Sequence, residues 1–199
     1  MLDARAREAL EGFSNWTGRT LSRLGLTANM ITAFGVVLSG VAAWRMAEGA
    51  FLAGGLIMTA GGCLDFCDGA VARVRGTASR FGAFLDSVTD RFSDAFVFSG
   101  LGWYYFRKSD EWLFAIVLAG YGAAVLTSYI RAKAESLGYD CKVGLLERAE
   151  RLIVINAGLI LSTFASSLIE IALLIVAVLG IVTVVQRLVY VSRQGRTES

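Results

Sequence analysis

Histidine and proline are both absent from the 199 residues. Without histidine, no imidazole can act as a base or nucleophile, which excludes Ser-His-Asp and Cys-His mechanisms, phosphohistidine intermediates and the usual His-containing zinc sites. Any proton transfer therefore depends on a carboxylate. Without proline, no helix can owe a kink to that residue, and the 22 glycines become the favoured points of close helix contact.

Cysteine is scarce, with Cys63, Cys67 and Cys141 as its three occurrences. We interpret them as small buried apolar residues. The alternative is a thiolate pair formed by Cys63 and Cys67, one helical turn apart. Such a pair supplies only two soft ligands, and the oxygen atoms nearby favour a hard ion instead.

Charged residues are also few, at 18% of the chain against 55% hydrophobic residues, and the mean hydropathy is +0.59. One small soluble core cannot hide this much apolar side chain, so the chain belongs in a bilayer. Segments long enough to cross a hydrocarbon core of roughly 30 Å lie at 29–47, 51–72, 81–106, 112–135, 147–166 and 168–190. The sequence therefore predicts an all-α protein with a single membrane domain over 1–199, whose six-helix transmembrane core occupies 26–199.

The first 25 residues have no continuous apolar region of the kind found in a cleaved signal peptide. Apolar residues recur among charges at near-helical spacing, at Leu10, Phe13, Trp16, Leu21 and Leu24. This pattern suits an amphipathic helix on the membrane surface over 1–25, and a solvated lead-in helix is the alternative.

Lysine and arginine crowd into the N-terminal stretch, the 73–80 and 131–151 connections, and the tail after Arg187. By the positive-inside rule these regions are cytoplasmic, so we expect a multi-pass protein of the cell membrane with both termini inside. The net charge of +2 is too small, and the cations too dispersed, to indicate nucleic-acid binding.

Four aspartates lie within one stretch, Asp65, Asp68, Asp86 and Asp90. An aspartate at the centre of a membrane helix costs about 3 kcal/mol, so four of them need a compensating partner or a polar cavity. Each pair is spaced by three or four residues and therefore projects from one helix face. A short basic connection joins the two helices, so the pairs should face each other at the cytoplasmic edge. Cations between them would relieve their repulsion, and all-oxygen ligands favour two magnesium or manganese ions that bind phosphates.

Small and basic residues next to the aspartates suit phosphate handling. Gly69 could let a nucleotide pack against the helix backbone, and Arg73 can meet a pyrophosphate oxygen. Gly82 can let a helix or a ligand come near. Taken singly, each of these residues is as readily explained by helix packing or by anchoring at the interface.

Together, Asp65-x2-Asp68-Gly69-x2-Ala72-Arg73-x8-Gly82-x3-Asp86-x3-Asp90 resembles the signature of the CDP-alcohol phosphatidyltransferase family at every defined position. The resemblance implies an enzyme that transfers the phosphatidyl or archaetidyl group of CDP-diacylglycerol or CDP-archaeol to an alcohol and releases CMP. It also implies a homodimer with a polar cavity at the cytoplasmic membrane edge.

The same resemblance implies a set of site residues. Asp65, Asp68, Asp86 and Asp90 would bind two magnesium ions, with manganese as a substitute, and Asp90 would take the proton of the acceptor hydroxyl. The CDP-lipid contacts would be Asn29, Met30, Ile31, Thr32, Gly69, Arg73 and Ser79. The chain departs from the common family pattern at Ala28, where relatives often have a proline that would only preset the first helical turn. Asp94 lies outside the signature, and we interpret it as a supporting polar residue rather than a metal ligand.

Five cations gather at one level in the second half of the chain, and this cluster suits a phosphorylated acceptor. They are Arg131, Lys133, Arg148, Arg151 and Arg187. The positive-inside rule alone would also put arginines there. The pattern resembles the subgroup of the family that uses inositol 1-phosphate. Relatives often have proline at the position of Ala149, and the alanine here is closer to archaeal members.

Two other functions stay open. Glycerol 3-phosphate could be the acceptor in the same reaction. From another class, the chain could be a divalent-cation transporter, because intramembrane acids also line ion pathways. An inverted repeat would favour transport, and the second aspartate pair has no counterpart in the other half of the chain.

Overall fold

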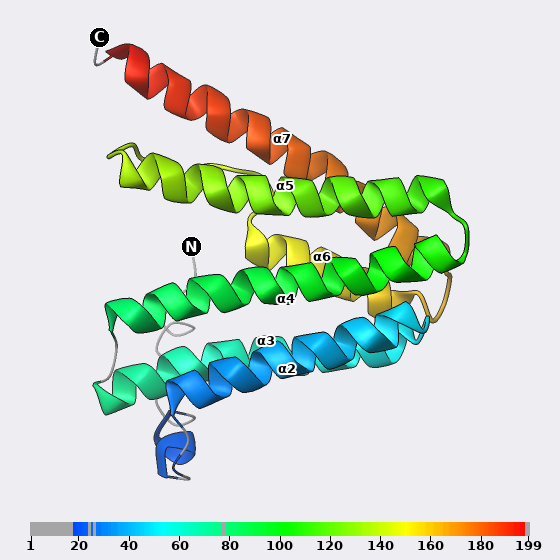
Figure 1. Ribbon diagram of the computed structural model, residues 1–199, viewed down its shortest axis with the longest axis horizontal. Helices are drawn as coiled ribbons and strands as arrows, with labels where there is room; N and C mark the ends of the chain where they lie inside the picture. Colours follow the sequence, from blue (N-terminus) through cyan, green and yellow to red (C-terminus); the bar gives the residue numbers. More distant parts are fainter. Residues whose placement is uncertain (1–17, 24, 26, 77–78, 198–199) are drawn as a thin grey trace, which may run out of the picture. The chain divides into compact units, whose positions relative to one another are not determined.

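The computed structural model describes residues 18–23, 25, 27–76 and 79–197. Figure 1 shows that helices make up almost all of this part of the chain, and its residues include no strand. The prediction of an all-α protein is therefore confirmed. Residues 18–23 are helical, whereas the rest of the predicted surface helix over 1–25 lies almost entirely outside the described residues.

Six long helices follow in chain order. They are α2 (Ala28–Ala47), α3 (Phe51–Arg75), α4 (Arg80–Arg107), α5 (Glu111–Ser136), α6 (Arg148–Leu161) and α7 (Ser167–Thr197). Short polar side chains begin three of them by accepting a hydrogen bond from a main-chain N–H of the first turn. Thr27 accepts from Met30 at 3.3 Å to begin α2, Ser79 accepts from Gly82 at 3.0 Å to begin α4, and Asp110 accepts from Leu113 at 3.0 Å to begin α5.

Four of the described helices are long and apolar enough to cross a membrane: α2, α3, α5 and α7. Helix α6 has 14 residues, so at 1.5 Å per residue it is only about 21 Å long. It ends at Leu161, earlier than the predicted 147–166 span, and two hydroxyls just after it donate back to carbonyls of its last turn. Ser162 donates to Leu159 O at 2.6 Å and Thr163 donates to Ile160 O at 2.8 Å.

The chain forms two compact units. The first comprises 1–41 and 57–93, and the second comprises 42–56 and 94–199. The first unit carries all four signature aspartates, and the second carries all five predicted acceptor cations. In the second unit α7 packs along α5 and α6. Its core includes the fully buried side chains of Met46, Leu101, Ile155, Leu159 and Leu173.

The connection between α5 and α6 is held against α7 although it has no regular structure. The main chain of Asp140 exchanges two hydrogen bonds with the Gln194 amide, at 3.1 and 2.7 Å. Leu146 N–H donates to Thr183 Oγ1 at 3.0 Å. Gly144 has a φ of +146°, and a Cβ there would lie 2.6 Å from the Thr183 side chain. This connection is therefore a packed strap rather than a loose loop.

The three cysteines differ in environment. Cys141 is buried, Cys67 is half-buried and Cys63 is exposed on α3. The expectation of a buried apolar residue is thus wrong for Cys63, because that face of the helix is left uncovered within the described residues. Burial raises the pKa of the Cys141 thiol, which favours the neutral, unreactive form.

Candidate active site

The four signature aspartates project from two helices of the first unit. Asp65 and Asp68 belong to α3, and Asp86 and Asp90 belong to α4. Asp68 is buried, with 8% of its surface exposed, whereas Asp86 is exposed. Asp65 and Asp90 are half-buried, and Asp90 Oδ2 lies 3.5 Å from Nη1 of Arg91.

Asp68 is fixed by a threonine from the start of α2. Thr32 Oγ1 lies 2.6 Å from Asp68 Oδ2 and 3.0 Å from the Ala28 carbonyl oxygen. Because a hydroxyl carries one proton, it donates to one of these acceptors at a time, and the shorter contact favours the carboxylate. A carboxylate has several acceptor sites, so this bond orients Asp68 while leaving capacity for a further ligand.

The Asp65 carboxylate lies next to Gly35 of α2. A Cβ at Gly35 would lie 3.2 Å from Asp65 Oδ1, closer than ordinary van der Waals contact. The bare backbone at this position therefore leaves room for the carboxylate. Gly40, one turn and a residue further along α2, has nothing within 4 Å of the equivalent point.

A cavity of about 520 Å³ opens beside these residues. Its walls come from the start of α2, the end of α3 and the start of α4. They comprise Thr27, Ala28, Asn29, Thr32, Asp68, Gly69, Ala72, Arg75, Ser79, Gly82, Ala83 and Asp86. One aspartate of each pair thus contributes to a single cavity.

Four of the predicted CDP-lipid residues line this cavity: Asn29, Thr32, Gly69 and Ser79. Two others do not, because Met30 is 53% exposed and Ile31 is buried. Arg73 lies within α3, and its side chain is outside the described part of the structure. The Ser79 hydroxyl, which caps α4, also faces the cavity.

Arg75 lines the cavity although sequence reasoning assigned it no role. Its Nε donates to Ser22 Oγ and its Nη2 donates to the Ser22 carbonyl, both at 2.8 Å. These bonds tie the segment before α2 to the end of α3. In the sequence, Arg75 belongs to the group of cations in the 73–80 connection, from which only the orientation of the protein in the membrane was inferred.

The donor set fits a hard divalent cation. Among the described residues, no three carboxylate, cysteine or histidine side chains are gathered as tightly as a bound metal requires. The candidate donors are nevertheless all carboxylate oxygens, the ligands that magnesium and manganese prefer. Asp68 and Asp86 face one cavity, and Gly35 leaves room for Asp65. The four aspartates could therefore hold such ions.

In the second unit, the predicted acceptor cations occur around two acids. Glu147 Oε1 lies 3.1 Å from Arg187 Nη2 and 3.6 Å from Arg131 Nη1. Arg131 Nε also donates to Glu135 at 2.9 Å. Arg187 is buried, and it donates further to the carbonyl oxygens of Val143 at 2.8 Å and Thr127 at 2.6 Å. Arg187 thereby joins three separate segments of the chain.

Asp94 is the second acid around which the predicted acceptor cations lie. Its Oδ2 lies 2.6 Å from Arg151 Nη2, and its Oδ1 lies 3.7 Å from Arg148 Nε. Arg151 and Asp94 are buried, whereas the Arg148 side chain is 27% exposed. Lys133 is exposed. The sequence analysis did not identify Asp94 and Glu147 as the acids that pair with the five predicted acceptor cations, although Glu147 directly precedes Arg148 in the chain.

In the part of the chain that the structure describes, apolar membrane-length helices and a cavity lined by one aspartate from each of two helices are features of a metal-dependent phosphotransferase of the membrane. The chain belongs to the CDP-alcohol phosphatidyltransferase family, whose model matches residues 25–191. It is therefore a CDP-alcohol phosphatidyltransferase, as the resemblance to the family signature implies.

Two relatives illustrate which members of the family the chain is similar to. It is 38% identical over 174 residues to archaetidylinositol phosphate synthase of Methanothermobacter thermautotrophicus, covering 85% of each chain. It is 37% identical over 187 residues to phosphatidylinositol phosphate synthase of Mycobacteroides abscessus, covering 92% of this chain and 85% of the relative.

Solved structures agree with this grouping. The fold matches a crystal structure of Mycobacterium tuberculosis phosphatidylinositol phosphate synthase with CDP-DAG bound, with a TM-score of 0.84, 35% identity and coverage of 89% and 92% of the two chains. A structure of the same synthase with manganese and citrate also matches with a TM-score of 0.84 and 35% identity, covering 89% and 88%.

Proposed function

We propose that this chain transfers the phosphatidyl or archaetidyl group of a CDP-activated lipid to a hydroxyl of inositol 1-phosphate and releases CMP. The observation that carries the proposal is the cavity to which Asp68 and Asp86 contribute together with Asn29, Gly69 and Ser79. The relatives support the acceptor, since they are named as synthases of archaetidylinositol phosphate and phosphatidylinositol phosphate.

Asp65, Asp68, Asp86 and Asp90 would hold two magnesium ions, for which manganese could substitute. Ions of this kind neutralise a pyrophosphate and polarise its phosphoryl oxygens. The manganese in a structure of a 35% identical synthase supports a divalent metal. Thr32 would orient Asp68 for this task through its 2.6 Å contact.

The CDP part of the lipid would lie in the cavity beside α2 and α3. Gly69 lets a ligand approach the α3 backbone, and Asn29 and Ser79 offer hydrogen-bonding groups on facing walls. Arg73 would meet the pyrophosphate, with Met30 and Ile31 contributing at the nucleotide side as the family resemblance implies. We add Arg75 to this set because it faces the same cavity.

In the reaction, the acceptor's hydroxyl oxygen forms a bond to the lipid-side phosphorus. The bond between that phosphorus and the oxygen bridging to the cytidylyl phosphate breaks, and CMP leaves with the bond's electron pair. Asp90 accepts the proton of the attacking hydroxyl, since without histidine a carboxylate must take this role.

The acceptor's phosphate would bind to the cations of the second unit. Among them, Arg131, Lys133 and Arg148 retain exposed surface. Arg151 and Arg187 are buried and bonded to Asp94, Glu147 and main-chain carbonyls, so we assign them chiefly to positioning the others. Charge-assisted contacts of this kind select a phosphorylated acceptor over a neutral alcohol.

We further propose six membrane spans, in which α4 joins the four long apolar helices and the shorter α6 crosses together with the residues that follow it, and a homodimer as the working form. The distribution of lysine and arginine supports cytoplasmic termini and a cytoplasmic site in a multi-pass protein of the cell membrane.

The decisive experiment is CMP release by the purified protein with CDP-lipid and four acceptors: inositol 1-phosphate, free inositol, glycerol 3-phosphate and serine. We expect inositol 1-phosphate to be preferred. Preference for free inositol or serine would refute the phosphate pocket. Preference for glycerol 3-phosphate would still support a phosphate-binding pocket, but it would identify glycerol 3-phosphate as the acceptor.

A further inference from the structure

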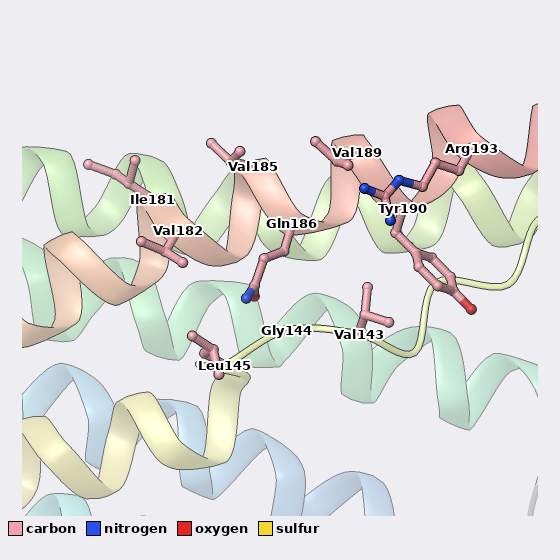
Figure 2. Close-up of a pocket in the computed structure, with 10 residues that line it drawn as sticks. All are labelled: Val143, Gly144, Leu145, Ile181, Val182, Val185, Gln186, Val189, Tyr190 and Arg193. Atoms are coloured by element: carbon pink, nitrogen blue, oxygen red, sulfur yellow. The ribbon is translucent and has the colours of Figure 1, made fainter.

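A second cavity, of about 670 Å³, lies in the second unit between α7 and the strap before α6. Figure 2 shows Val143, Gly144 and Leu145 on one wall and side chains of α7 on the other. We call this cavity the α7 groove. The α7 side comprises Ile181, Val182, Val185, Gln186, Val189, Tyr190 and Arg193.

The α7 groove has the chemistry and the length of a site for one lipid chain. Its aliphatic residues are uncovered in the described structure, with Leu145 59% and Val185 53% exposed. From Ile181 to Arg193, α7 rises by about 18 Å, at 1.5 Å per residue. That is slightly more than one leaflet, because the hydrocarbon core is roughly 30 Å thick.

Two polar side chains distinguish the α7 groove from an ordinary lipid-facing surface. Gln186 Oε1 is buried and has no hydrogen-bond partner among the described residues, and Figure 2 shows its side chain reaching toward the strap. A primary amide offers both a donor and an acceptor, and a half-turn about its last bond exchanges them. Arg193 lines the groove at the end opposite Ile181. It carries a charge that a phosphate would complement.

The strap wall of the α7 groove is preformed. Arg187 Nε donates to the Val143 carbonyl at 2.8 Å, and Leu146 N–H donates to Thr183 Oγ1 at 3.0 Å. These bonds lie on both sides of Gly144, so a ligand would not have to order this wall on binding. A preformed site loses less conformational entropy when it is filled.

We propose that the α7 groove binds one anionic phospholipid of the surrounding membrane. One lipid chain lies along Val182 and Val185, and its phosphate meets Arg193. The Gln186 amide, turned to present its N–H₂ group, donates to an oxygen at the glycerol linkage. The lipid is a bound ligand here and undergoes no reaction.

Native mass spectrometry of the purified protein in neutral detergent tests this, because it reads bound lipid and oligomeric state together. The probes are phosphatidylglycerol and phosphatidylcholine with identical chains. One cation near the membrane surface contributes about a fivefold preference for an anionic lipid. We expect that preference in the parent, its loss in Arg193→Gln and its retention in Arg193→Lys. Val185→Trp, which fills the groove, should weaken binding of both lipids.

Arg107→Gln is the matched control, since it removes an exposed cation that does not line the groove. It should leave the preference unchanged, and an equal loss in this variant would overturn the proposal. Equal binding of both lipids by the parent would also overturn it. The proposal would also be overturned if Val185→Trp dissociated an oligomer while lipid binding stayed intact. That result would identify a second copy of the chain as the occupant of the groove. Displacement of the bound phosphatidylglycerol by stoichiometric CDP-lipid would assign the groove to the donor substrate instead.

Discussion

Arg151 Nη2 lies 2.6 Å from Oδ2 of Asp94, and both side chains are buried. Asp94 stands one turn beyond Asp90 on α4, and Arg151 stands in the first turn of α6. A charge-assisted hydrogen bond therefore joins the helix that carries two signature aspartates to the helix that carries Arg148. This pairing gives the buried Asp94 carboxylate a cationic partner, as expected for a supporting polar residue.

Asp94→Asn should destabilise the protein strongly, because removing one partner of a buried ion pair leaves the other charge uncompensated and costs about 3–5 kcal/mol. The measurement is thermal unfolding in detergent. Adding Arg151→Met to the same chain should recover a large part of the loss, since the orphaned charge is then gone. Strictly additive losses in the double variant would show that the two side chains do not interact energetically.

Arg148→Ala should impair binding of the acceptor, whereas Arg151→Ala should reduce the stability of the fold. The Arg148 side chain is 27% exposed, whereas that of Arg151 is 3% exposed and paired with Asp94. We expect Arg148→Ala to raise the KM for inositol 1-phosphate at least tenfold and to leave the KM for CDP-lipid nearly unchanged, since losing such a contact costs about 2–5 kcal/mol. Arg151→Ala should instead lower the unfolding temperature. Equal KM effects of both variants at equal stability would contradict this division.

Gly35→Ala should weaken metal binding, because the added methyl would lie 3.2 Å from Asp65 Oδ1 and displace the carboxylate. The expected result is a severalfold higher magnesium concentration for half-maximal CMP release. Gly40→Ala is the matched control on the same helix, with nothing within 4 Å of the new methyl. An identical magnesium requirement in both variants would remove Gly35 from the account of the site.

Asp90→Asn should lower turnover by roughly 10²–10⁴-fold, the range typical for loss of a general base. CDP-lipid binding should be affected much less, because three carboxylates and the cavity walls remain. Single-turnover CMP release and equilibrium binding of CDP-lipid separate the two effects. Turnover above about a tenth of the parent rate would assign the base to another residue.

Exhaustive chelation should abolish CMP release, and either magnesium or manganese should restore it, because the donor set consists of carboxylate oxygens. The thermal unfolding of the chelated protein serves as the control for an intact fold. Full activity in the chelated sample would refute a metal-dependent reaction.

Local patterns made much of the site predictable. The aspartate spacing depends only on helix periodicity, so the assignment of each pair to one helix was available from the chain alone. The same holds for the basic residues near the helix ends. The family resemblance implied Asn29, Thr32 and Gly69 as CDP-lipid contacts; all three line one cavity, and their contact with the lipid stays a prediction.

Contacts between distant residues were not predictable in this way. Arg151 and Asp94 are 57 positions apart, and Arg187 and Glu147 are 40 apart. A count of cations could not reveal that four of the five, Arg131, Arg148, Arg151 and Arg187, lie within ion-pair distance of Asp94 or Glu147. The early end of α6 was not predictable either, because Phe164 and Ala165 extend the apolar pattern past Leu161.

The strap between α5 and α6 carries an exposed lysine, Lys142, and would be an obvious site for trypsin if it were a loose loop. A protease needs several consecutive residues to leave the fold and enter its cleft. Arg187 holds Val143, the residue directly after Lys142, and Gln194 holds Asp140 on the other side. Cleavage after Lys142 must therefore wait for the C-terminal part of α7 to separate from the strap, so the rate of nicking there would report how often that helix opens.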